Sequence, residues 1–210
     1  MCRMKKLICP ATILLTLIIG ITITACSPEA VRGGPTRGIW DGNIYTNHYL
    51  NLQFELPGEW VIVSDEELAA AAGIPPEEFV AQGAKIPHYF WETNSTIIDM
   101  MATDTFLGLG IIITYEWINI AYGRITAPEY IDAVLGNLAD MGVDAHITPG
   151  TTQIGGYLWY SYVSEVSTGD ETVLIRNFVN IQRGFVRTIS VIHNSFHDPV
   201  DEVLGFFDGL

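Results

Sequence analysis

Apolar and polar residues alternate along the first third of the chain after residue 39, and this pattern predicts β-structure. Residues 40–56 alternate well enough for two strands, and Leu50, Leu52, Phe54 and Leu56 fall at period two on one face. A turn at Pro57-Gly58 follows, and the alternation resumes beyond it. We therefore expect a sheet that begins near residue 40 and buries one of its faces.

Longer apolar runs predict the remaining strands. Two lie in the middle of the chain at 97–103 and 109–118, and the last third is rich in strands at 156–166, 172–182 and 185–193. Short turns rather than long crossovers separate these strands. Since two-residue turns join antiparallel neighbours, the sheet should be mainly antiparallel.

The sequence marks the first helix by a capping box. Ser64 precedes Glu67 by three residues, which is the spacing at which two side chains and two backbone N–H groups satisfy each other. The box predicts a helix over residues 65–72, and Gly73 supplies the left-handed residue that ends it.

A second capping box, Thr126 with Glu129, opens an amphipathic helix that ends at Gly142. Shorter helices are expected from residue 75 and over residues 199–207. Helices packed on an antiparallel sheet place the protein in the α+β class.

The N-terminus has the three parts of a lipoprotein signal peptide. A positive start is followed by an apolar run over residues 7–23 and then by Ile23-Thr24-Ala25-Cys26, in which small residues precede a cysteine. This pattern predicts cleavage before Cys26 and acylation of its sulfur, and two acyl chains suffice for stable anchoring. An uncleaved N-terminal membrane helix is the alternative. We expect a signal peptide at 1–25, a lipidated cysteine and flexible tether at 26–38, and one domain at 39–210.

Composition limits the partners of this domain. The full chain carries a net charge of −14, and removal of residues 1–25 takes away three of the ten basic residues and none of the 24 acids, which leaves −17. Such a surface disfavours nucleic acid and anionic headgroups. The expected partners are the membrane, through the lipid, and a protein of the cell envelope, and the oligomeric state stays open. Cys26 is the one cysteine left after cleavage, so no disulfide or thiolate site is expected in the domain.

Two motifs carry a resemblance to a known group of proteins. The stretch from Tyr45 to Trp60 (YTNHYLNLQFELPGEW) resembles the opening of a group of uncharacterised bacterial lipoproteins with the pattern Y-T-N-x-Y-x-x-L-x-F-x-L-P-x-x-W. The segment from Ile98 to Ala102 is similar to their Y-D-M-M-A strand, with Ile98 in place of the tyrosine. The order of elements also resembles the PsbP-like α/β/α sandwich. That resemblance implies a fold used largely for docking and binding, without a cofactor residue that can be matched here.

Candidate chemistry is sparse. His193 and His197 are four residues apart and are weak candidates for a metal site, but they span a turn and lack an evident third ligand. Asp99 lies in an otherwise apolar strand, where it is either a solvent-facing residue, a hydrogen-bonded buried acid or a functional group. With Asp104 it could form a pair of carboxylates for acid–base work or for a hard cation.

The sequence therefore favours a membrane-tethered, extracytoplasmic domain that binds or docks without catalysis and without a cofactor. A small hydrolase-like enzyme with a dispersed Asp/His site and a solute-capture lipoprotein are the alternatives. A pocket with converging polar side chains would favour either alternative over a flat docking surface.

Overall fold

A computed structural model describes residues 34–93, 96–104, 106–118, 125–168, 171–194, 200–205 and 207. About half of this part of the chain belongs to two antiparallel sheets, so the α+β class with a mainly antiparallel sheet is confirmed. Within these residues no helix has the length and apolar character needed to cross a membrane.

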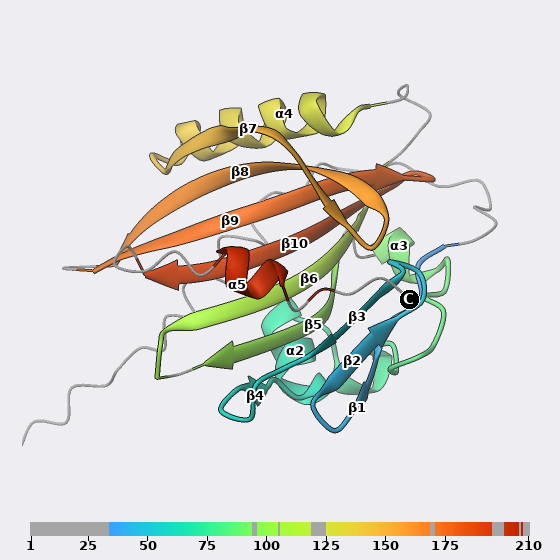
Figure 1. Cartoon of the computed structure of the whole chain (residues 1–210). Helices are drawn as coiled ribbons and strands as arrows, with labels where there is room; N and C mark the ends of the chain where they lie inside the picture. Colours follow the sequence, from blue (N-terminus) through green and yellow to red (C-terminus); the bar gives the residue numbers. More distant parts are fainter. Residues whose placement is uncertain are drawn as a thin grey trace, which may run out of the picture.

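The larger sheet has seven strands in the order β4-β5-β6-β10-β9-β8-β7 (Figure 1). Its strands are β4 (Val61–Ile62), β5 (Thr96–Asp104), β6 (Leu109–Trp117), β7 (Asp144–Ile154), β8 (Tyr157–Thr168), β9 (Glu171–Gln182) and β10 (Phe185–Asn194). Hairpins join β5 to β6, β7 to β8, β8 to β9 and β9 to β10. Strand β10 also pairs with β6, and this pairing joins strands β4 to β6 and strands β7 to β10 into one sheet.

The smaller sheet consists of β1 (Ile39–Asp41), β2 (Ile44–Asn47) and β3 (Leu52–Glu55) in that order. Residues 40–56 therefore form three strands rather than the two predicted, because a turn at residues 42–43 interrupts the first. The predicted apolar face is confirmed: Leu50, Leu52, Phe54 and Leu56 are all buried.

Helices cover the sheet unequally. The long helix α4 (Ala127–Asp140) packs on one face, while α2 (Asp65–Ala72), the 3-10 turn η1 (Pro76–Glu78), α3 (Phe90–Thr93) and α5 (Val200–Leu204) are short. Both predicted capping boxes form with the bonds expected of them. Figure 1 shows α4 alongside β7 and β8, and α5 in front of the middle strands.

Strand alternation explains how the two faces of the large sheet differ. Val179 and Val186 pack with α4, while their chain neighbours Phe178 and Phe185 belong to the main core that also contains the small sheet. Successive side chains of a strand point to opposite faces, so α4 and the small sheet lie on opposite sides of the large sheet.

Two further predictions need correction. Strand β7 was not expected, because its side chains are mostly exposed and it contains Pro149 and Gly150, so it shows no apolar alternation. It is an edge strand, where proline and irregular pairing are tolerated. Of the helix expected over residues 199–207, the structure describes a short helix of five residues, Val200–Leu204.

The prediction that residues 34–38 are part of a flexible tether is wrong. These residues are rich in glycine and proline, yet Arg37 is 2% exposed and Thr36 forms a β-bridge with Lys85. The folded domain therefore includes these residues.

Candidate functional site

A small polar pocket lies between the large sheet and α4. We refer to it as the Glu116 pocket, and its cavity has a volume of about 70 Å³, enough for a few water molecules or a small ligand group. Five strands and the helix contribute its walls: Thr96, Thr114, Glu116, Tyr130, Leu138, Tyr162, Ser164, Ile175, Asn177, Thr188 and Ser190.

Register explains why polar residues gather here. Thr114 of β6 pairs with Thr188 of β10, and Ser190 pairs with Asn177 of β9. Paired residues of an antiparallel sheet project from the same face, so these four short side chains point toward the α4 side together. These side chains line the cavity and give its sheet side hydroxyl and amide groups.

Glu116 is the sole carboxylic acid among the described residues that line the pocket. The residue is 8% exposed, and the hydroxyl of Tyr130 donates a hydrogen bond of 2.6 Å to its Oε2. No described residue donates to the other oxygen, Oε1. Burial raises the pKa of the Glu116 carboxyl to about 7, although the Tyr130 hydrogen bond acts to lower it. The pocket therefore holds an acid that changes its charge near neutral pH.

The tyrosines beside Glu116 stay protonated across that range. Burial, together with the charge of Glu116, raises the pKa of both Tyr130 and Tyr162 above the usual value for tyrosine. Glu116 is thus the one lining group of the described pocket that titrates near neutral pH.

The opposite wall has a hydrogen bond of its own. The Ser190 hydroxyl donates to Oδ1 of Asn177 at 2.7 Å, and Nδ2 of Asn177 donates to the carbonyl of Ile175 at 3.3 Å. The hydroxyl protons of Ser190 and Tyr130 are therefore already engaged, and their oxygens keep lone pairs free to accept.

Asp99 lies outside this pocket, in a β-bulge of β5 between Ile98 and Met100. It is 1% exposed, and the interpretation as a hydrogen-bonded buried acid is confirmed. Four donors reach its carboxylate: Gly38 N at 2.9 Å, Tyr45 Oη at 2.5 Å, Asn47 Nδ2 at 2.7 Å and Tyr115 Oη at 2.9 Å. Burial raises the pKa of the Asp99 carboxyl, and the bonds from Tyr45 and Gly38 oppose that rise.

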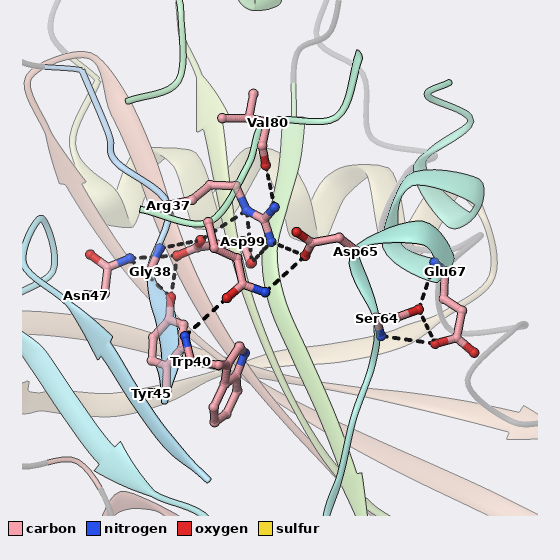
Figure 2. A network of polar contacts seen from close by, with 11 residues as sticks. Arg37, Gly38, Trp40, Tyr45, Asn47, Ser64, Asp65, Glu67, Val80 and Asp99 are labelled. Atoms are coloured by element: carbon pink, nitrogen blue, oxygen red, sulfur yellow. Dashed lines mark hydrogen bonds and ion pairs between the residues drawn. The ribbon is translucent and has the colours of Figure 1, made fainter. Parts of the chain in front are cut away.

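Arg37 completes the cluster around Asp99, as Figure 2 shows. Its Nη2 donates to the Asp99 carbonyl at 2.7 Å and to Oδ1 of Asp65, at the start of α2, at 2.9 Å. A further bond reaches the Val80 carbonyl, and the guanidinium lies over the Phe79 ring. These contacts connect four segments of the chain, so the cluster fastens the first described residues to the large sheet.

The other predicted site residues do not converge. Asp104 is bound locally, since its Oδ1 accepts from the backbone N–H groups of Phe106 and Leu107 in the β5–β6 turn. The possible carboxylate pair with Asp99 does not form, since Asp99 binds a separate set of donors. Groups of three or more metal-ligating side chains are absent from the described residues.

The histidine pair cannot be assembled from the described chain. His193 is 2% exposed near the end of β10, with Nδ1 2.9 Å from the Asn194 carbonyl, and His197 lies outside the described residues. Since Ser190 points into the pocket, His193 projects from the opposite face of the sheet. His193 and Glu116 therefore do not share a site.

Glu116 was missed at the sequence level. A signal was present, since a single acid interrupts the apolar run from Leu109 to Trp117 at the position after Tyr115. Alternation places Glu116 on the same face as Thr114, and two polar residues at period two inside a buried strand indicate a polar patch.

No protein-family model matches the chain. No curated protein matches it either. A crystal structure from Bacteroides thetaiotaomicron VPI-5482, determined at 1.50 Å resolution, is similar with a TM-score of 0.42 and 7% sequence identity. The match covers 83% of this chain and 48% of the other, so the chain spans about half the length of that protein.

Proposed function

We propose that the protein is a lipoprotein, tethered through Cys26 to the extracytoplasmic face of a membrane, whose domain binds a small polar ligand without catalysis. The observation that carries the binding function is the Glu116 pocket. It combines a cavity, a buried carboxyl with one oxygen available and a wall of hydroxyl and amide groups. Pockets that bind small molecules place a few polar groups in this way within an apolar frame.

The anchor is supported by the signal-peptide pattern and by the way the chain enters the domain. The contacts of Arg37 fix the point where the chain enters the fold, and ten residues, 27–36, lie between Arg37 and the cysteine proposed to be acylated. Lipid attachment would thus hold the domain close to the membrane.

The absence of catalysis is proposed because the polar groups of the described pocket suit recognition better than reaction. Most glycoside hydrolases use two carboxyl groups across one bond, and a serine or threonine nucleophile needs a neighbouring base. The hydroxyl of Ser190 instead donates to Asn177, and the Glu116 carboxyl accepts from Tyr130.

We also propose that the fold belongs to the PsbP-like α/β/α sandwiches. A central antiparallel sheet with α4 on one face and short helices with the small sheet on the other supports this assignment. A crystal structure that superposes on a PsbP domain with the same strand order would support it, and a different order would refute it.

The anchor is tested by Cys26→Ala in the full chain, expressed in a bacterial host with an alkyne-labelled fatty acid. We expect the variant to lose the label and to accumulate as a larger precursor. Cys9→Ala is the matched control, since Cys9 leaves with the signal peptide, and it should be processed and labelled normally. Normal processing of Cys26→Ala would refute the lipoprotein assignment.

Binding is tested by a thermal-shift screen of the full-length protein in mild detergent against sugars, amino acids, small amines and short carboxylic acids. We expect one class to raise the melting temperature. Thr188→Leu should abolish the shift, because the larger side chain fills the pocket, whereas Thr151→Leu, at an exposed position of β7, should keep it. A shift that persists in Thr188→Leu, or no shift in any class, would contradict the pocket as the binding site.

A further inference from the structure

Glu116 and Tyr130 present acceptor oxygens to the Glu116 pocket. The Tyr130 proton is used on Glu116 Oε2 and the Ser190 proton on Asn177 Oδ1. What Glu116 and Tyr130 offer to a ligand is therefore two neighbouring acceptor oxygens: Oε1 of Glu116 and the hydroxyl oxygen of Tyr130. A ligand that carries several donors on one atom would match them, and an ammonium group carries three.

Charge points to the same ligand class. Glu116 is the only residue with a full charge among the described lining residues, and no arginine, lysine or histidine shares the wall. The whole chain carries a net charge of −14, so its field attracts cations toward the pocket.

We propose that the Glu116 pocket binds the primary ammonium group of a small organic amine, with the Glu116 carboxylate as its counter-ion and the Tyr130 hydroxyl oxygen as a further acceptor. This inference rests on the binding function proposed above and specifies its ligand. A hard divalent cation fits less well, because such ions need several carboxylate or carbonyl ligands, and the described walls supply one carboxyl group.

Proton release accompanies binding. The raised pKa of the Glu116 carboxyl means that the empty pocket is partly protonated at neutral pH, and an ammonium ion binds the ionised form. The other groups that face Glu116 from β5, β10, β8 and α4 are hydroxyls, and the tyrosines among them stay protonated. Affinity for an amine should therefore rise about tenfold between pH 6 and pH 8, as the ionised fraction rises.

Ethanolamine and ethylene glycol form a matched pair of probes, since they differ in an ammonium group against a hydroxyl. Titration calorimetry of the full-length protein in phosphate buffer at pH 8 should give an affinity for ethanolamine at least about tenfold higher than for ethylene glycol. Glu116→Gln should abolish this preference while it keeps the shape of the side chain. Glu165→Gln, an exposed site on β8 with the same loss of charge, should retain it.

The outcomes separate this inference from the proposed function. Equal binding of both probes, or an ethanolamine affinity that Glu116→Gln leaves unchanged, would overturn the ammonium assignment and leave a pocket for neutral ligands. If neither probe binds, the ammonium assignment fails, whereas the proposed binding site fails only if the thermal-shift screen also gives no shift in any class. Because Glu116→Gln can alter folding, the pH dependence of ethanolamine binding to the unaltered protein is a second test, and a flat profile from pH 6 to pH 8 would also overturn the assignment.

Discussion

The Glu116 carboxyl should make the stability of the protein fall as pH rises, and Glu116→Gln should remove that effect. In the folded protein this carboxyl has a pKa of about 7, raised by burial from 4.5. Between these two values the folded state holds a proton that the unfolded state has released. Unfolding therefore releases a proton in this window, and a rise in pH favours unfolding.

The magnitude follows from the two pKa values. Relative to a permanently neutral side chain, the ionisable Glu116 lowers the free energy of unfolding by about 0.8 kcal/mol at pH 5, about 2 kcal/mol at pH 6 and about 3 kcal/mol at pH 8. Glutamine keeps the shape and can still accept the Tyr130 hydrogen bond. The variant should thus be more stable than the wild-type protein by an amount that grows by about 2.5 kcal/mol between pH 5 and pH 8.

Urea unfolding of the full-length protein, followed by tryptophan fluorescence at pH 5, 6, 7 and 8, measures this difference. Other titrating groups contribute equally to the unfolding free energy of both proteins, so their contributions cancel in the difference. Buffers with a primary amine, such as Tris, should be avoided, because the pocket is proposed to bind that group. Glu165→Gln is the matched control, because the Glu165 side chain is exposed. The difference in unfolding free energy between this variant and the wild-type protein should stay constant across the pH series. A constant difference between Glu116→Gln and wild type across the pH series would refute the account of a buried, proton-holding carboxyl.

Three substitutions test the fold around the site. Asp99→Ala removes the acceptor of four hydrogen bonds and leaves the Arg37 charge buried beside it. Urea unfolding should therefore show that the free energy of unfolding falls by about 3–5 kcal/mol. A fall of less than about 1 kcal/mol would mean that the cluster contributes little to stability. Gly155→Ala would place its Cβ 2.6 Å from a backbone oxygen of the β2–β3 turn, whereas no atom lies within 3.8 Å of the Cβ of Gly156→Ala. Both glycines have positive φ, so both alanine variants should lose stability through backbone strain. Gly155→Ala should lose about 1–3 kcal/mol more unfolding free energy than Gly156→Ala, as measured by calorimetry, because of the clash. Equal losses in the two variants would contradict the clash. Thr126→Ala removes the cap of α4 and should lower the unfolding free energy by about 1 kcal/mol without unfolding the helix, as circular dichroism would show.

Local features of the fold could be predicted because their causes are local. Ser64 and Thr126 cap their helices through residues three positions away, and the apolar face of β3 follows from period-two spacing alone. The edge strand β7 escaped prediction because edge strands need not bury a face. Residues 34–38 have the composition of a linker, yet Arg37 finds its acceptors on Asp99, 62 positions along the chain.

The sequence by itself determined the α+β class, the mainly antiparallel strands, the two main helices and the chain's acidic charge. Only the tertiary structure decided where the polar groups meet. Asp99, the candidate from the sequence, is satisfied inside a structural cluster, while Glu116 lines a cavity that Thr188, Ser190 and Asn177 complete from other strands. The physical reason is register: periodicity assigns each residue to a face of its own strand, but the pairing of β6, β10, β9 and β8 decides which residues of different strands become neighbours.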